Sequence, residues 1–340
     1  MTIFFRVDCG GPYGLGHAMR CRTLALAIHV QAPDVPLVFV TTPPALRSIV
    51  EEINDRDWRL MLCGYGEADC LSFIRNEAIS GDSLVVDMPQ HWNSVTRLPS
   101  LRQHLHVVRL DAPWADPETC DLLVLPGMHH SAETVEQLDA AFGERLLMGA
   151  EYVLLRREIL APSHGSFMHD PWIIFWAGGS DPDHALDLLL TITGTLEQRL
   201  PGTQRIFCMG SQSVPWSIPP LSPHVWITGC DISYIREASI FVTLWGMTAY
   251  EALALGTPTL TIARTEAEAE DAASLEAATD GAVQSLGTLA GLMRETLCDR
   301  LVALWQDTKE RKRMHYASAG LVDGKGAERV ALAVLALAKK

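Results

Sequence analysis

Positive charge is scarce in this sequence. Its 27 lysines and arginines face 41 aspartates and glutamates, which gives a formal net charge of −14 at pH 7. A surface that neutralises nucleic-acid phosphates needs an excess of basic side chains, so we expect no nucleic-acid partner. An anionic ligand must instead be held locally, by helix N-termini and backbone amides.

Cysteine pairs and long apolar runs are missing as well. The eight cysteines are scattered without a C-x-x-C pair, most of them inside apolar stretches. This is typical of buried reduced thiols and not of disulfides or a zinc site. Arg6 and Asp8 interrupt the apolar start that a secretory signal requires. The apolar run Val330–Ala338 is too short to cross a bilayer. We therefore expect a cytoplasmic protein without an integral membrane segment.

What the sequence does contain is an alternation of short β-rich runs and helical periods. This alternation predicts an α/β fold with parallel sheets, and 340 residues predict two domains. The linker is expected at Leu160–Pro171, which has proline, glycine and serine and no apolar periodicity. The sequence therefore predicts an N-terminal Rossmann-like domain over residues 1–160 and a C-terminal one over residues 171–340. The final helix, after Gly326, is one that can pack back on the N-terminal domain.

Both expected domains open with a strand, a glycine-rich turn and a helix. Two such domains facing each other make a cleft at the carboxyl ends of their strands, where open α/β sheets bind ligands. Strands are expected at residues 3–8, 36–41, 58–62, 83–87, 106–111 and 122–125, then from 172 and at 205–209, 224–228, 240–244 and 259–263. The chain after residue 263 is expected to be helical, including residues 289–319 and a last helix after Gly326.

The first motif whose residues indicate a chemical function follows the first expected strand. Gly14 and Gly16 allow a tight turn and a close approach of ligand to backbone. His17 then starts a helix, where the positive end of the helix dipole disfavours imidazolium, so we expect a neutral ring that can accept a proton. Arg20 lies one turn further on the same face. The alternative is an ordinary strand–turn–helix junction with an incidental histidine.

The second motif, Gly178–Asp181, links a strand to a helix. Its backbone amides and the helix dipole suit a phosphate. The alternative is structural, because Ser180–Asp183 also has the pattern of a capping box with proline in the first turn. Two aspartates separated by one residue match a metal-binding motif by letter, but capping explains them better, and we predict no metal.

The third motif runs from Gly246 to Pro258, again from strand to helix. Thr248 and Glu251 have capping-box spacing, which could account for both. In the functional interpretation, residues 246–248 present amides and a hydroxyl to phosphate, and Glu251 accepts two ribose hydroxyls. A capping pair requires neither Gly246 nor the terminal Gly-x-Pro, which favours the functional interpretation.

Other polar residues give weaker signals. Asp87 and Asp111 each end an apolar strand, where a carboxylate can face a cleft or cap the next helix. His129–His130 and the acidic run Glu266–Asp271 lack metal-ligand spacing. The nine tryptophans suit the core and a cleft wall better than an array that stacks on sugars.

Together these segments resemble the UDP-2,4-diacetamido-2,4,6-trideoxy-β-L-altropyranose hydrolases of pseudaminic acid biosynthesis and the related spore-coat polysaccharide proteins. The matching pieces occur in family order over almost the whole chain. They are Arg6-x-Asp8, Gly14–Arg20, Val85–Asp87, Leu110–Asp111, Cys120–Leu123, Gly149–Glu158, Gly178–Asp181, Gly246–Pro258 and Leu321–Arg329.

The resemblance implies a GT-B-type fold and a reaction in which water displaces UDP from an anomeric carbon with inversion. It implies that His17 is the general base or positions the water, with Arg20 and Asp8 in the same catalytic set. It also implies a nucleotide-sugar site formed by Gly14, Gly16, Tyr152, Arg156, Gly178, Gly179, Ser180, Asp181, Gly246, Met247, Thr248 and Glu251. No cofactor is expected, because helix ends that hold a diphosphate make a divalent ion unnecessary.

Three positions depart from the family pattern. Met88–Pro89 replaces a His-Tyr pair, Arg264–Asp271 stands where an Asn-Gln pair is usual, and Leu244–Trp245 replaces small polar residues. All three concern the sugar or the cleft lining, so an unidentified sugar acceptor in place of water stays open. The alternatives to a hydrolase are therefore a glycosyltransferase of the same architecture, in which His17 activates an acceptor hydroxyl, and a catalytically silent nucleotide-sugar-binding protein.

Overall fold

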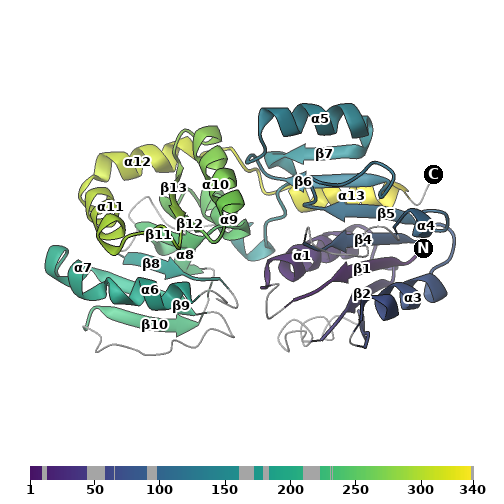
Figure 1. Ribbon diagram of the computed structural model, residues 1–340, viewed down its shortest axis with the longest axis horizontal. Helices are drawn as coiled ribbons and strands as arrows, with labels where there is room; N and C mark the ends of the chain where they lie inside the picture. Colours follow the sequence, from purple (N-terminus) through teal and green to yellow (C-terminus); the bar gives the residue numbers. More distant parts are fainter. Residues whose placement is uncertain are drawn as a thin grey trace. The chain divides into compact units, whose positions relative to one another are not determined.

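The computed structural model describes residues 1–9, 14–43, 58–64, 66–89, 98–160, 172–178, 184–209, 223–229, 231 and 233–337. The chain divides into two compact units, shown in Figure 1. Unit 1 comprises Met1–Gly127, Ser131–Leu155 and Gly324–Lys340, and unit 2 comprises Met128–His130 and Arg156–Asp323. Residues 161–171, most of the expected linker, lie outside the described residues.

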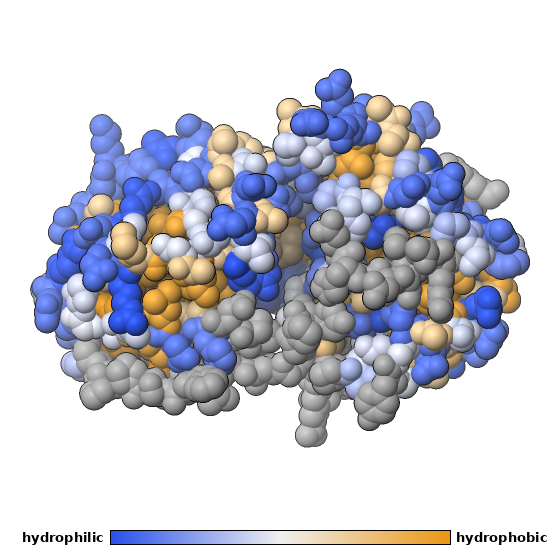
Figure 2. All heavy atoms as spheres, in the orientation of Figure 1, coloured by the Kyte–Doolittle hydropathy of each residue, from blue (hydrophilic) through white to orange (hydrophobic). Residues whose placement is uncertain are grey.

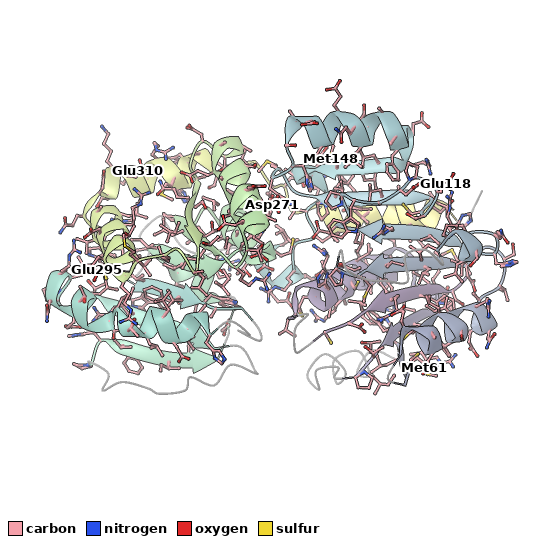
Figure 3. The ribbon with its side chains drawn as sticks, in the orientation of Figure 1. Met61, Glu118, Met148, Asp271, Glu295 and Glu310 are labelled. Carbon is pink, nitrogen blue, oxygen red and sulfur yellow. The ribbon has the colours of Figure 1, made fainter. Side chains whose placement is uncertain are left out.

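Unit 1 is built on a parallel sheet of seven strands in the order β3-β2-β1-β4-β5-β6-β7. The strands are β1 (Ile3–Val7), β2 (Leu37–Thr41), β3 (Arg59–Leu62), β4 (Ser83–Asp87), β5 (His106–Leu110), β6 (Leu122–Pro126) and β7 (Leu146–Gly149). Most are continuous apolar runs, because helices cover both faces of the sheet. Met61 and Met148, labelled in Figure 3, mark its two edge strands.

The helices of unit 1 divide between the two faces of the sheet according to the alternation of side chains along β1. Ile3 and Phe5 pack with α1 and α13, whereas Phe4 points to the opposite core with α3, α4 and α5. The helices are α1 (Gly16–Gln31), α3 (Glu67–Glu77), α4 (Leu98–Leu101), α5 (Ala132–Phe142) and α13 (Gly326–Leu337). Two short 3-10 helices, η3 (Gly143–Arg145) and η4 (Ala150–Tyr152), lie before and after β7.

Helix α13, the last of the chain, closes unit 1. Val330 and Val334 are fully buried in the core that α1 shares with the sheet. The helix approaches η4 so closely at Gly326 that a Cβ atom there would clash with the backbone of Tyr152 and Val153. The 12 residues of α13 are therefore part of the first core, although they follow all of unit 2 in the sequence.

Unit 2 repeats the plan with a parallel sheet of six strands in the order β10-β9-β8-β11-β12-β13. The strands are β8 (Trp172–Trp176), β9 (Gln204–Met209), β10 (Val225–Gly229), β11 (Ile240–Leu244), β12 (Thr259–Ala263) and β13 (Val283–Thr288). The helices are η5 (Arg157–Leu160), α6 (Ala185–Thr191), α7 (Thr193–Arg199), α8 (Ser233–Glu237), α9 (Met247–Leu255), α10 (Glu266–Ala278), α11 (Arg294–Gln306) and α12 (Thr308–Ala317).

Two cores enclose the sheet of unit 2. Helices α6, α7 and α11 pack against Ile173 and Phe175, and helices α8 and α9 pack against Ile174 and Trp176. Helix α12 buries Met314 and is otherwise mostly polar. Hydrophilic residues accordingly prevail over α11 and α12 in Figure 2.

The expected strands are present, but two further strands were not predicted. Both lie at an edge of a sheet: β7 has four half-buried residues and β13 carries glutamine, serine and threonine. The expectation that the chain after residue 263 is helical is therefore wrong at β13, and the expected helix over residues 289–319 is two helices. They break at Asp307, whose carboxylate caps α12 by accepting a hydrogen bond from the backbone amide of Glu310.

Candidate active site

Each sheet reverses its strand order at one point, and three of the predicted motifs follow the strands that flank these points. The reversal lies between β1 and β4 in unit 1 and between β8 and β11 in unit 2. Ligands of open α/β sheets bind at such points, outside the carboxyl ends of the strands. His17 comes after β1 and Asp87 ends β4, while Gly178 comes after β8 and Gly246 after β11. The register pairs Val7 with Asp87.

His17 lies in the first turn of α1 and meets the carboxylate of Asp87. The distance from His17 Nδ1 to Asp87 Oδ1 is 2.6 Å. Arg20, one turn later, donates to the same carboxylate from Nε and Nη2, and each of these hydrogen bonds measures 2.7 Å. Asp87 is almost fully buried, whereas 27% of the His17 side chain is exposed. The structure thus places a partly exposed imidazole on a buried, doubly anchored carboxylate.

The charges in this cluster decide the protonation of Asp87. Burial alone would raise its pKa, but the positive charge of Arg20 and the contact with His17 outweigh burial and lower the pKa to about 2. For Arg20, burial would lower the pKa, yet Asp111 and Asp87 together raise it. Asp87 is therefore a carboxylate and Arg20 a cation at every pH at which the protein would work.

An ionised Asp87 also determines the tautomer of His17. A carboxylate only accepts hydrogen bonds, so the 2.6 Å contact assigns the ring proton to Nδ1. Arg20 Nη2 lies 3.3 Å from the same nitrogen. Arg20 Nη2 and the protonated Nδ1 are both donors, so they do not hydrogen-bond each other, and the shorter contact with Asp87 is the hydrogen bond of Nδ1. The ring then keeps Nε2 as its acceptor, which is the arrangement of a general base held by a carboxylate.

Asp111 completes the cluster at the end of β5. Its Oδ2 accepts a bond of 2.6 Å from Arg20 Nη1. The backbone of Asp111 has a φ of 52°, a left-handed conformation that is uncommon outside glycine. Neither Asp87 nor Asp111 belongs to the site set predicted from sequence, although both end an apolar strand. For Asp87, the position at the switch point is the signal that could identify it, and Asp111 ends the strand next to β4.

Asp8, which the resemblance assigns to catalysis, lies in a different cluster of unit 1. Its carboxylate forms a two-bond ion pair with Arg6, with distances of 2.7 and 2.8 Å, and accepts further bonds from Thr41 and from the amide of Thr42. Burial would raise the pKa of Asp8, but the bonds to Arg6 and Thr42 lower it. Glu67 binds the other side of Arg6. A catalytic role for Asp8 stays a prediction.

The glycines of the first motif are described in part. Gly14 has a φ of 62°, as a tight turn requires, and Gly16 is the first residue of α1. Gly178 follows β8 with a φ of 83°. Gly179, Ser180 and Asp181 lie outside the described residues, so the choice between phosphate binding and capping at this turn stays open.

In the third motif the helix does not start as a capping box would require. Helix α9 begins at Met247 after Gly246, which has a φ of 147°, and no side chain caps it. Thr248 is thus the second residue of the helix. Glu251 does not reach back to the backbone of the first turn but forms an ion pair with Arg156, in which both bonds measure 2.6 Å. The capping interpretation of Thr248 and Glu251 is therefore wrong.

The residue before Glu251 is held by a short segment that comes from the first half of the sequence. The hydroxyl of Tyr250 accepts a bond of 2.9 Å from the amide of Met128 and lies 2.8 Å from Nδ1 of His129. The His129 ring also meets Trp245 edge to face. Tyr152, another predicted site residue, is half-buried in η4 against the first core of unit 1.

Within the described ranges, neither a metal-binding group nor a membrane-spanning helix is present. No group of three or more histidine, cysteine, aspartate or glutamate side chains there could hold a metal ion. No helix within those ranges is both long and apolar enough to span a bilayer.

Comparison with known proteins defines the fold. No family model matches the sequence, and no curated protein matches it. Solved structures do match. The chain is similar to the glycotransferase of kitacinnamycin, with a TM-score of 0.65 and 12% sequence identity over 99% of both chains. It is similar to S. aureus MnaA with UDP, with a TM-score of 0.66 and 13% identity over 97% of this chain and 95% of that one, and to the pneumococcal O-GlcNAc transferase GtfA in complex with UDP and GlcNAc, with a TM-score of 0.64 and 8% identity over 100% of this chain and 99% of that one. The predicted α/β fold with two Rossmann-like domains of the GT-B type is confirmed.

Proposed function

We propose that this protein is an enzyme that hydrolyses a UDP-sugar, with His17 as the base and the turns at Gly178 and Gly246 as binding elements for the nucleotide. The observation that supports this best is the His17–Asp87 pair, with a separation of 2.6 Å and the ring partly exposed. A histidine held through Nδ1 by an ionised carboxylate is poised to take a proton at Nε2. The predicted substrate is a deoxy, acetamido sugar for nonulosonic acid or surface-polysaccharide biosynthesis.

The proposed reaction is a single inverting displacement. Nε2 of His17 removes a proton from water while the water oxygen bonds to the anomeric carbon. The bond from that carbon to the β-phosphate oxygen breaks, and its electron pair leaves with UDP. Asp87 stabilises the imidazolium that forms, and Arg20 holds Asp87 in place. The turns at Gly178 and Gly246 would offer backbone amides to the negative charge that develops on the diphosphate.

A glycosyltransferase is the second candidate, and the solved neighbours favour it as much. Two of them are transferases by name and match almost the whole chain. The chemistry would use the same base, with an acceptor hydroxyl in place of water. The departures at Met88, Pro89 and Glu266–Asp271 would then shape an acceptor site. Met88 is buried at the end of β4, next to Asp87.

The two candidates separate in one assay. The protein is mixed with a panel of UDP- and CMP-linked sugars, and the released nucleotide is measured with and without alcohol acceptors. Release of UDP without an acceptor supports the hydrolase, and release only after an acceptor is added supports the transferase. Binding of UDP without any turnover on the panel would contradict both and leave the silent nucleotide-sugar-binding protein as the function.

A further inference from the structure

The carboxylate predicted to recognise the ribose is itself gripped by an arginine. Arg156 donates from Nε to one oxygen of Glu251 and from Nη2 to the other, and both hydrogen bonds measure 2.6 Å. This two-bond geometry fixes the plane of the carboxylate as well as its position. Only 5% of the Glu251 side chain is exposed, against 21% of the Arg156 side chain. The arginine thus supplies the positive charge that a buried carboxylate requires.

The two bonds from Arg156 leave hydrogen-bond acceptor capacity on the Glu251 carboxylate. Each carboxylate oxygen can accept about two hydrogen bonds, so one bond to Arg156 leaves capacity on each oxygen for a ligand hydroxyl. Two vicinal hydroxyls, such as O2′ and O3′ of a ribose, present two donors at a similar spacing. Glu251 lies on α9, the helix that begins right after the Gly246 turn. A diphosphate at the turn would place the ribose along this helix.

The surroundings of the pair keep it from rotating away. Tyr250, the neighbour of Glu251 on α9, is fixed by Met128 and His129. On the other side, Arg236 donates to the carbonyl of Ile159, three residues after Arg156. Both ends of the ion pair are thus attached to backbone that is held by further hydrogen bonds.

We infer that Arg156 is a positioning residue, which orients the Glu251 carboxylate toward the two hydroxyls of a ribose and does not contact the nucleotide itself. This inference rests on the proposed nucleotide site. It differs from the direct substrate contact that the sequence resemblance suggested for Arg156. Arg156 would then determine the preference for ribose over deoxyribose in the nucleotide, and binding of the diphosphate would not depend on Arg156.

The test compares UDP with 2′-deoxy-UDP, each titrated calorimetrically into the full chain. The unaltered protein should prefer UDP by about tenfold, because one hydrogen bond to a charged group is lost with the deoxy compound. Arg156→Ala should weaken UDP binding by about tenfold or more and 2′-deoxy-UDP binding much less, so the preference falls toward one. Glu251→Gln should have the same effect, and the double variant should lose little more.

Controls separate this role from a loss of folding or of the site. Arg157→Ala changes the exposed neighbouring arginine and should leave both affinities unchanged. Arg156→Lys retains the charge without the two-bond grip and should give an intermediate preference; its melting temperature shows whether it is folded. An equal loss for both nucleotides in the Arg156 variants, or no preference in the unaltered protein, would overturn the inference alone. Absence of any UDP binding by the unaltered protein would overturn the proposed function together with it.

Discussion

Arg6 and Arg20 each sit at the centre of a buried carboxylate cluster in unit 1, yet only the Arg20 cluster contains a ring that solvent reaches. Arg6 binds the carboxylates of Asp8 and Glu67 and the carbonyl of Val40, and Asp8 also accepts a bond from Thr41. Arg20 binds Asp87 and Asp111, and Asp87 also binds His17. The first cluster is closed on itself, whereas the second has a group that can exchange a proton. Similar chemistry thus serves stability in one place and is suited to catalysis in the other.

The largest effect that would separate the clusters is expected at His17. His17→Ala removes the proposed base and should lower kcat by about 10²- to 10⁴-fold, with UDP affinity unchanged, because none of the proposed nucleotide contacts of unit 2 is altered. The measurement is UDP release under saturating substrate, beside UDP titration. His29→Ala, near the other end of α1, serves as the control and should retain full turnover. Unchanged turnover in His17→Ala would eliminate the base role.

Asp87 should show the next largest effect. Asp87→Asn removes the charge that stabilises the imidazolium, and the amide can donate to Nδ1 and favour the wrong tautomer, so kcat should fall about a hundredfold or more. The variant also leaves Arg20 buried with half of its carboxylate partners, which should reduce the free energy of unfolding by about 3 kcal/mol. Urea denaturation and turnover are measured on the same preparation. A stable, fully active variant would show that Asp87 does not hold a catalytic ring.

Asp8 should behave differently, because its cluster is closed. Asp8→Asn should lower the free energy of unfolding by about 3 kcal/mol, since Arg6 loses a buried two-bond partner. The folded fraction should turn over substrate within about threefold of the unaltered protein. This variant decides between the contacts seen here and the catalytic role that the resemblance implies. A hundredfold loss of kcat in a folded Asp8→Asn protein would favour the resemblance.

The smallest effect is the dependence of stability on pH. The pKa of Asp87 is lowered to about 2 in the folded protein, while an aspartate in the unfolded chain has a pKa of about 3.9. A lowered folded pKa stabilises the fold above about pH 3.9, and this contribution, about 3 kcal/mol, is lost as pH falls toward 2. The stability difference between the unaltered protein and Asp87→Asn should therefore narrow between pH 4 and pH 2. A difference that is constant over this interval would mean that Asp87 is not held as a carboxylate.

Much of the fold could be predicted from sequence because parallel strands between helices are continuous apolar runs. The strands at 3–7, 83–87 and 240–244 are of this kind and were predicted within a residue. The edge strands β7 and β13 were not, since an edge strand is paired on one side only and its residues are half-buried and partly polar. Local pattern carries little information where burial is incomplete.

The candidate site was predictable only in part, for a related reason. The glycine turns and His17 lie close together in sequence, so their pattern could be read directly. The contacts of His17 with Asp87 and of Arg156 with Glu251 join residues 70 and 95 positions apart. Spacing in the sequence contains no such information, and Thr248 with Glu251 even suggested a cap that does not form.

The sequence by itself determined the residue types, the helical and strand periods and the positions of the turns, because these depend on neighbouring residues and on burial. The tertiary structure alone decided which cation each carboxylate meets. Asp8 and Asp87 both follow a buried strand and look alike in sequence. Both strands flank the switch point, but side chains alternate between the two faces of the sheet. Asp87, the register partner of Val7, lies on the face that packs against α1, where it receives His17 and Arg20, whereas Asp8, one residue after Val7, lies on the opposite face with Arg6 and Thr42.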